Sequence, residues 1–267
     1  YVRVIGACRD GVRIVGLMIP AGDTVHKANR IADEHALARA VEAGEVLAFY
    51  QPIICLKTQS LVGFEALARW RRPGVGVLAP PDFLAMADDI DQLGKLSSNI
   101  RSNAVDDLSA WRRTSPQAQQ LFVAANVSVS ELTDPGFQDR IIAYVQRADL
   151  PAGVFKLEIS ETEIMRDPEA AADAMARLSE AGIALALDDF GTGYSSLARL
   201  EMLPFDVVKV DQYFVRAMIG NESATTVVQS VVQLARHFKM KVVAEGVETG
   251  EELRALKALG VPLAQGY

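Results

Sequence analysis

The sequence has few cysteines and no long apolar run, and each deficit excludes a class of protein. Only two of the 267 residues are cysteines, Cys8 and Cys55, too few for a disulfide framework or a structural zinc site. A reducing, cytoplasmic location is therefore expected. No apolar run reaches the roughly 18 residues of a membrane-spanning helix, and Tyr1 does not open a signal peptide. We therefore expect a soluble segment without membrane contact.

An excess of positive charge is also missing. The chain carries 34 acidic and 27 basic residues, a formal net charge of −7. Because polymeric nucleic acids and anionic membranes bind mainly through clustered Lys and Arg, neither is an expected partner. Half of the residues are hydrophobic, which predicts a folded globular core.

Eight short apolar or β-branched runs alternate with longer amphipathic stretches, which is typical of βα units feeding a parallel sheet. The runs are 46–54, 61–67, 122–127, 154–159, 183–187, 206–210, 241–244 and 261–264. Eight such units in this length fit a (β/α)8 barrel. A doubly wound open sheet is the alternative, but no G-x-G-x-x-G follows the first strand, and polar residues end nearly every strand.

Helices are predicted between these strands, several of them opened by proline. Their ranges are 27–43, 81–93, 96–113, 135–147, 168–181, 223–238 and 250–259. Before them, two β-like runs flank Asp10-Gly11, which is a hairpin signal. We therefore divide the chain into residues 1–26, the end of an upstream regulatory domain or a linker, and residues 27–267, the barrel.

Polar side chains gather at the predicted carboxyl ends of the strands, where barrels of this kind build their active sites. Side chains alternate between the two faces of a strand. On one face of each predicted strand the side chains are small or apolar, except for the last one, which is polar. The polar set is Glu65, Asn126, Glu158, Asp188, Asp189, Lys209 and Glu245. Asp188 and Asp189 cannot both face inward within one regular strand, so Asp189 is expected just past the strand and Glu161 in the loop after Glu158. Lys156, which shares the parity of Glu158, has no explanation in the pattern.

Five converging carboxylates repel one another by roughly 4 kcal/mol for each pair 4 Å apart at an effective dielectric of 20. Either some of them are protonated or cations are bound. Two divalent cations together with Lys209 would balance the charge, and a donor set of oxygens without His or Cys favours Mg²⁺ or Mn²⁺. Paired ions of this kind suit in-line attack on a phosphodiester. An enolase-like barrel with one Mg²⁺ and Lys209 as a base is a further alternative.

Any one strand-end acid is more often a helix cap or a solvated loop residue. The ordered series of motifs is more specific, and through it residues 37–267 resemble the EAL family of cyclic di-GMP phosphodiesterases. The motifs are Tyr50-Gln51-Pro52-Ile53, Glu65-Ala66-Leu67 with Arg69, Asn126-Val127-Ser128, Leu157-Glu158-Ile159-Ser160-Glu161, Asp188-Asp189-Phe190-Gly191-Thr192-Gly193-Tyr194-Ser195-Ser196-Leu197, Lys209-Val210-Asp211, Ala244-Glu245-Gly246-Val247-Glu248-Thr249 and Gln265-Gly266-Tyr267.

The resemblance implies a (β/α)8 barrel whose first strand runs antiparallel, and hydrolysis of cyclic di-GMP to linear pGpG with two Mg²⁺ or Mn²⁺ ions. It implies that Glu65, Asn126, Glu158 and Asp188 hold one ion and that Asp188, Asp189 and Glu245 surround the second. Lys209 would orient the attacking water. The substrate or its surroundings would be lined by Gln51, Leu67, Arg69, Asp211, Glu248 and Gln265.

Regulation is implied as well. In the family, Glu161 braces the loop at 190–197, which links metal occupancy to homodimer contacts. Relatives that lack site residues persist as non-hydrolysing receptors, so a receptor for cyclic di-GMP is the alternative function, although no site residue is missing here. A complete barrel of this family carries one more helix after Tyr267, so a truncated C-terminal end is expected.

Overall fold

The computed structural model describes residues 2–5, 14–17, 26–164, 167–191, 200 and 202–266. These fall into two compact units, one containing residues 1–49 and 67–103 and the other residues 50–66 and 104–267. Two strands and one helix continue from one unit into the other, namely β3 (Val46–Cys55), β4 (Leu61–Arg72) and α3 (Leu93–Thr114).

The first unit contains the amino-terminal elements and a small hairpin at the end of β4. In it, β1 (Val2–Ile5) and β2 (Ile14–Leu17) pair antiparallel. The predicted Asp10-Gly11 turn between them lies outside the described residues. The helix α1 (His26–Ala43) follows, and β5 (Gly76–Leu78) pairs antiparallel with β4. A short 3-10 turn (Pro80–Asp82) leads into α2 (Leu84–Asp89).

Two predictions for this unit were wrong. The second barrel strand does not stop at Leu67, because pairing with β5 extends it to Arg72. The helix predicted over 81–93 is broken, since α2 ends at Asp89 and Asp91 takes a left-handed conformation with φ of 55°. A β-carbon destabilises this conformation and no helix continues through it.

The second unit is a closed barrel of eight strands. Neighbours follow the order β3, β11, β10, β9, β8, β7, β6 and β4, and the pairing of β3 with β4 closes the ring. All pairs from β4 round to β11 are parallel, whereas β3 runs antiparallel to β11. The predicted barrel with a reversed first strand is therefore confirmed. The other strands are β6 (Phe122–Asn126), β7 (Phe155–Ser160), β8 (Ala184–Phe190), β9 (Val207–Val210), β10 (Lys241–Val247) and β11 (Leu263–Gly266).

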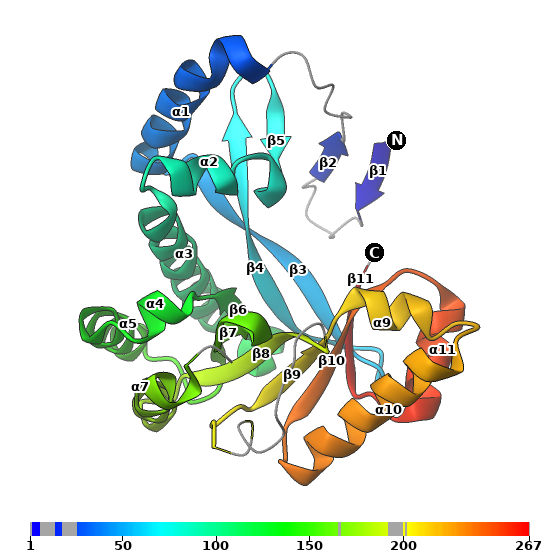
Figure 1. The fold of residues 1–267 in the computed structure, drawn as a ribbon. Coiled ribbons are helices and arrows are strands. Elements are labelled where there is room, and N and C mark those ends of the chain that lie inside the picture. The colour runs from blue at the N-terminus through cyan, green and yellow to red at the C-terminus, as the bar shows by residue number, and fades with distance from the viewer. Residues whose placement is uncertain are drawn as a thin grey trace. The chain divides into compact units, whose positions relative to one another are not determined.

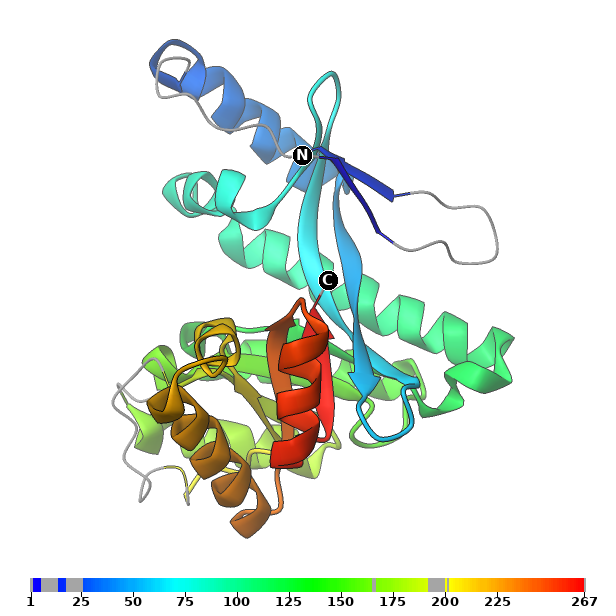
Figure 2. The same cartoon turned by 90° about the vertical axis from the view of Figure 1, so that its right-hand side faces the viewer.

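Amphipathic helices cover the outside of this barrel (Figure 1). Asp134 caps α5 and Asn221 caps α10 by accepting backbone N–H groups of the first turn, as caps of this type do. In Figure 2, α11 lies against the outer side of β10 and β11. The helices are α4 (Val129–Leu132), α5 (Pro135–Arg147), α6 (Glu161–Ile164), α7 (Pro168–Glu180), α9 (Gln212–Ala217), α10 (Glu222–His237) and α11 (Gly250–Leu259), with a 3-10 turn over Pro116–Gln120.

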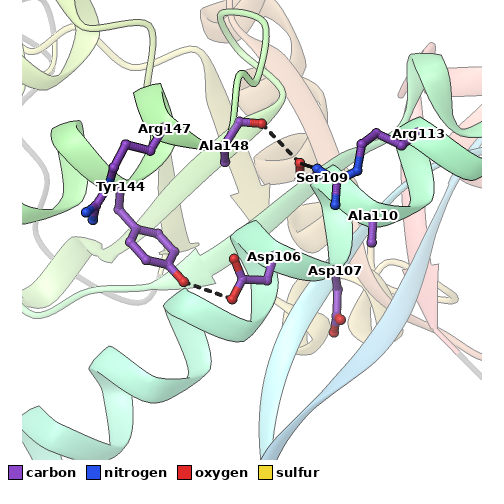
Figure 3. A pocket seen from close by; sticks show the side chains of 8 residues that line it. All are labelled: Asp106, Asp107, Ser109, Ala110, Arg113, Tyr144, Arg147 and Ala148. Atoms are coloured by element: carbon purple, nitrogen blue, oxygen red, sulfur yellow. Dashed lines mark hydrogen bonds between the residues drawn. The ribbon is translucent and has the colours of Figure 1, made fainter.

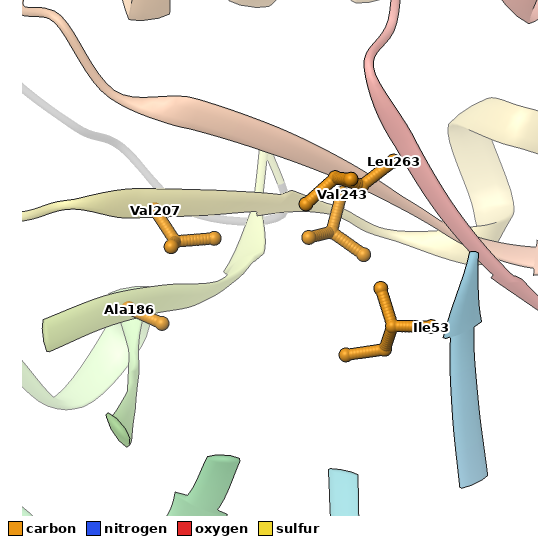
Figure 4. Close-up of a cluster of buried hydrophobic side chains, with 5 residues drawn as sticks. All are labelled: Ile53, Ala186, Val207, Val243 and Leu263. Carbon is orange, nitrogen blue, oxygen red and sulfur yellow. The ribbon is translucent and has the colours of Figure 1, made fainter. Parts of the chain in front are cut away.

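The barrel interior is filled by one apolar side chain from each of several strands. Figure 4 shows five of them projecting toward one another, and each is buried: Ile53, Ala186, Val207, Val243 and Leu263. This apolar layer occupies the centre of the barrel. None of the helices in the described ranges combines the length and apolar character that crossing a bilayer demands.

Candidate metal centre at the barrel mouth

The apolar layer determines where the polar side chains lie. A residue two positions along a strand points to the same side of the sheet, about 7 Å further on. Two residues beyond Ala186, Val207, Val243 and Leu263 stand Asp188, Lys209, Glu245 and Gln265. On the reversed strand β3, the residue on the corresponding side of Ile53 is Gln51. The sequence therefore stacks a polar layer directly on the apolar one, at the carboxyl ends of the parallel strands.

Lys209 is the centre of this polar layer. Its side chain is 1% exposed, and its Nζ lies 3.2 Å from Glu65 Oε2 and 2.9 Å from Glu158 Oε2. The same Nζ lies 3.0 Å from Asp188 Oδ1 and 2.8 Å from Glu245 Oε1. The carboxylates brought together here, with Asp189, are called the carboxylate ring below; its members are Glu65, Glu158, Asp188, Asp189 and Glu245.

Two amides complete the layer. Gln265 donates from Nε2 to Glu65 Oε2 at 2.6 Å and to Glu245 Oε1 at 3.2 Å. Its own Oε1 is buried and has no hydrogen-bond partner among the described residues, which is costly unless another group engages it. Asn126 donates from Nδ2 to Glu65 Oε1 at 3.5 Å. The resemblance implies that Gln265 lines the substrate or its surroundings, and in this structure it donates to two carboxylates of the ring.

Asp188 and Asp189 both contribute a carboxylate to the ring, although the regular alternation of side chains along a strand does not allow both to face inward. The expectation that Asp189 lies past the strand was wrong, because β8 runs to Phe190. Asp189 instead has φ of 55°, and the register with β9 shifts between Leu187 and Phe190. This irregularity interrupts the alternation of side chains. As a result, carboxylate oxygens of Asp188, Asp189 and Glu245 lie within 4.8 Å of one another.

The donor set fits divalent cations. The ring offers carboxylate and amide oxygens, which are ligands of Mg²⁺ and Mn²⁺. Asp188, Asp189 and Glu245 are already close enough to share one ion, and the orphaned Oε1 of Gln265 lies in the same layer. Glu65 and Glu158, which are almost completely buried, supply the deeper carboxylates.

Burial and mutual repulsion shift the pKa values of the carboxylates in the ring. Burial raises the pKa of Glu158 well above its ordinary value, and the neighbouring Glu65 charge raises it further. Burial raises the pKa of Glu245 to about 7. For Glu65, burial is outweighed by Lys209 and by hydrogen bonds, so its pKa is lowered. Burial alone would lower the pKa of Lys209, but the four carboxylates raise it well above the usual range. The surroundings therefore favour the charged form of Lys209 and, at Glu158 and Glu245, the protonated form.

A pH dependence of stability follows from Glu245. Its pKa is raised on folding from a usual value of 4.5, so its contribution is complete below that pH and is lost as the pH rises through about 7. In the presence of a chelator, the unfolding free energy of the wild type should fall by about 2–3 kcal/mol relative to that of Glu245→Gln between pH 5 and pH 8. Urea titrations at each pH measure both free energies. A difference between the two proteins that stays constant across this range would contradict the raised pKa of Glu245.

Among the remaining expected residues, Gln51 shares the strand parity of the buried Ile53 and therefore faces the ring. Asp211 caps α9, accepting the Tyr213 backbone N–H at 2.8 Å. The side chain of Glu248 pairs with Arg216 at 2.7 Å. Leu67 and Arg69 continue β4 beyond Glu65 with the same parity, but they belong to the first unit.

Glu161 begins the short helix α6 instead of standing in a loop. It is buried, and its Oε2 accepts the Gly191 backbone N–H at 2.7 Å. Gly191 follows Asp189 and Phe190 directly, so Glu161 holds the backbone next to the ring. The greater part of the loop at 190–197 lies outside the described residues.

Lys156, which the sequence pattern left without explanation, lies at the opposite end of the barrel. Its Nζ donates to the Gly153 carbonyl at 2.7 Å and stands 4.8 Å from the centre of the Phe122 ring. The Phe122 ring in turn lies against Gly63, where a β-carbon would come within 2.7 Å of it. Lys156 is thus part of the barrel floor.

Two features of the mouth escaped prediction. Arg216, the partner of Glu248, lies on α9, and no sequence signal indicates which side chain this helix presents to the β10 loop. At Gly266, a β-carbon would lie 1.9 Å from the Val247 carbonyl oxygen, where the register of β10 against β11 shifts. Gly266 directly follows Gln265, so the close approach helps to fix that amide; a glycine inside a strand is the available signal.

A separate cavity of about 450 Å³ lies on the outside of the barrel unit, between α3 and α5. Figure 3 shows Tyr144 donating to Asp106, and Ser109 bridging Arg113 and the Ala148 carbonyl. None of its lining residues belongs to the carboxylate ring.

Comparison with known proteins shows the family to which the chain is related. The chain is 36% identical over 231 residues to the uncharacterized protein Rv1354c of Mycobacterium tuberculosis, covering 86% of this chain and 37% of the relative. It is also 36% identical over 231 residues to the cyclic di-GMP phosphodiesterase RocR of Pseudomonas aeruginosa, covering 86% of this chain and 58% of RocR. The chain thus spans between about a third and three fifths of these relatives.

A solved structure described as the PaMucR phosphodiesterase in complex with c-di-GMP superposes with a TM-score of 0.81 at 31% identity, covering 87% of this chain and 93% of that chain. The family model for the EAL domain matches residues 34–267. These residues include every member of the carboxylate ring together with Lys209 and Gln265. The chain therefore belongs to the EAL domain family.

Proposed function

We propose that this chain hydrolyses cyclic di-GMP to linear pGpG in a reaction that depends on two Mg²⁺ or Mn²⁺ ions. The observation that carries the proposal is the convergence of five carboxylates, two amides and a buried lysine on one end of the barrel. Membership of the EAL domain family supports the substrate, because RocR is named a cyclic di-GMP phosphodiesterase and the PaMucR structure contains c-di-GMP.

The residues of the ring would form two sets of metal ligands. Glu65, Asn126, Glu158 and Asp188 would hold one ion, and Asp188, Asp189 and Glu245 the other. When bound, such ions neutralise phosphodiester charge and activate water for attack on phosphorus. Hydrolysis to pGpG breaks the bond from phosphorus to the 3′ oxygen, which leaves with a proton, while the 5′ phosphate stays on the product.

Lys209 and Glu245 have distinct tasks in this scheme. The Lys209 ammonium, held charged by its neighbours, would donate hydrogen bonds to the attacking water and fix its direction. Glu245, whose Oε1 lies 2.8 Å from Lys209 Nζ, would take up the proton that the water loses. Gln51, Leu67, Arg69, Asp211 and Glu248 would contact or frame the nucleotide.

The direct test is product formation. Purified protein is incubated with cyclic di-GMP and Mg²⁺ or Mn²⁺, and nucleotides are separated by chromatography. We expect pGpG with either ion and none in chelator. A folded protein that binds cyclic di-GMP equally with and without chelator but forms no product would instead be a receptor. A homodimer formed through the 190–197 loop, an upstream regulatory domain and a cytoplasmic location stay predictions.

Removal of the Glu161 carboxylate should impair the reaction indirectly. Glu161→Ala leaves the Gly191 N–H without its acceptor, so we expect turnover to fall by about 10- to 100-fold, the range for groups that orient ligands. Mn²⁺ affinity, measured by calorimetry, should change less. Glu163→Ala, which removes a nearby carboxylate that accepts the Val129 N–H, is the matched control. Normal kinetics in Glu161→Ala would refute its role.

A further inference from the structure

Three aromatic side chains pack together on the outer side of β3 and β4, behind the polar layer. Tyr50 on β3 lies edge-on to Trp111 on α3 with ring centroids 4.7 Å apart, and it meets Phe64 on β4 at 6.0 Å. Phe64 and Trp111 complete the cluster at 5.3 Å. Because side chains alternate along a strand, the residues that follow the two strand aromatics, Gln51 and Glu65, face the barrel interior.

The tyrosine of this cluster is also held by its hydroxyl group. Tyr50 Oη donates to Asp107 Oδ2 on α3 at 2.5 Å, a distance typical of a hydroxyl bound to a carboxylate. Burial raises the pKa of Tyr50 well above its ordinary value, and the Asp107 carboxylate raises it further, so the hydroxyl keeps its proton and remains the donor. Tyr50 is therefore attached to α3 both by its aromatic ring and by its hydroxyl.

This attachment acts on a part of β3 that is less supported on one side. Among the described residues, the pairing of β3 with β11 covers Ile53, Ile54 and Cys55 and stops short of Gln51. On its other side β3 pairs with β4. Tyr50 directly precedes Gln51, so its contacts with α3 support the backbone at Gln51 from outside the barrel.

We propose that Asp107 is a positioning residue for the substrate site: by accepting the Tyr50 hydroxyl, it holds the segment of β3 that presents Gln51 to the nucleotide. Asp107 lies on α3 and does not belong to the carboxylate ring, so it acts on the site through Tyr50. Loss of the hydrogen bond should therefore weaken the binding of cyclic di-GMP and leave metal binding unchanged. This inference rests on the proposed function, since it requires that Gln51 contacts cyclic di-GMP.

The hydrogen bond can be removed from either end. Tyr50→Phe keeps the aromatic ring and removes the donor, and Asp107→Ala removes the acceptor. Each should raise KM for cyclic di-GMP about five- to tenfold, with little change in kcat or in Mn²⁺ affinity measured by calorimetry. Because both changes remove one bond, the double variant should be no worse than either single variant. Asp107→Asn keeps an oxygen acceptor and should restore most of the lost affinity.

A second tyrosine that binds α3 provides the matched control. Tyr144 on α5 donates to Asp106 Oδ2 at 2.8 Å, and Asp106 directly precedes Asp107. Successive side chains on a helix point about 100° apart, and in Figure 3 the two carboxylates leave α3 in different directions. Tyr144→Phe removes a similar bond that does not involve β3. It should lower stability in urea titrations about as much as Tyr50→Phe, while KM keeps its wild-type value.

The outcomes separate this inference from the proposed function. An unchanged KM in Tyr50→Phe and Asp107→Ala, an equal rise in Tyr144→Phe, or multiplied effects in the double variant would overturn the inference and leave the proposed function intact. If the wild type binds cyclic di-GMP without forming pGpG, the proposed function fails, and a selective loss of nucleotide affinity in Tyr50→Phe would still support the inference. Absence of nucleotide binding in every protein would overturn both.

A measurement without nucleotide covers the case in which Asp107→Ala does not fold. The side chains of glutamine are labelled with ¹⁵N, and the amide signal of Gln51 is assigned by its loss in Gln51→Glu. This signal should shift in Tyr50→Phe and stay in place in Tyr144→Phe. A Gln51 signal that is the same in the wild type and in Tyr50→Phe would contradict the proposal.

Discussion

Replacing Asp188 by Asn should reduce the hydrolysis of cyclic di-GMP by about 10³-fold or more. Asp188 is the one carboxylate that belongs to both proposed ligand sets, and its Oδ1 also lies 3.0 Å from Lys209 Nζ. Metal ions contribute several kcal/mol of transition-state stabilisation, and each 1.4 kcal/mol is a factor of ten in rate. Steady-state assays at saturating Mn²⁺ measure the loss.

The same substitution should weaken metal binding, which distinguishes a ligand from a residue that acts only on the substrate. Calorimetry with Mn²⁺ should show both binding steps weakened. Asp139→Asn is the matched control, because Asp139 is exposed on α5 and its pairing with Arg177 lies outside the ring. An Asp188→Asn protein with normal Mn²⁺ affinity would show that Asp188 is not a metal ligand, whatever its rate.

Substitution of Lys209 by Ala should also lower turnover, but it should not weaken metal binding. Turnover should fall by about 10²- to 10³-fold, as it does when a preorganised hydrogen-bond donor is removed from an active site. Metal binding should be retained, since Lys209 contributes no ligand atom. The metal-free protein should unfold at a lower temperature, because buried carboxylates lose their counter-charge. Saturating Mn²⁺ should restore much of that loss.

Paired assays of rate, Mn²⁺ affinity and thermal unfolding check this pattern. Lys156→Ala serves as the control for loss of a buried lysine, and it should destabilise the barrel floor without a comparable loss of rate per folded molecule. A Lys209→Ala enzyme that turns over at a near-normal rate would show that the lysine has no part in orienting the attacking water.

Much of the barrel could be predicted because its strands are short, apolar and separated by amphipathic helices. All eight predicted runs are strands, and α5 and α11 begin and end at the predicted residues. Parity along a strand also placed Lys209 and Glu245 on the interior face. These predictions succeed because they depend on local periodicity, which the closed sheet preserves.

The remaining features depend on tertiary contacts that periodicity does not encode. The reversed direction of β3 was expected only from the family resemblance, because the pattern of an apolar run does not indicate the direction of the strand. The left-handed residue at Asp189 places two adjacent carboxylates in one ring, and nothing in Asp188-Asp189 as a dipeptide indicates it. Likewise, only the folded barrel shows that Lys156 lies over Phe122 while Lys209 lies among acids.

If the carboxylate ring holds a pair of divalent cations, anomalous scattering from a crystal soaked in Mn²⁺ will locate both of them. We expect two Mn²⁺ peaks at the barrel mouth, bridged by Asp188, with the deeper one contacting Glu65 and Glu158. A well-ordered crystal with no peak in the ring, or with these carboxylates turned toward bulk solvent, would contradict it.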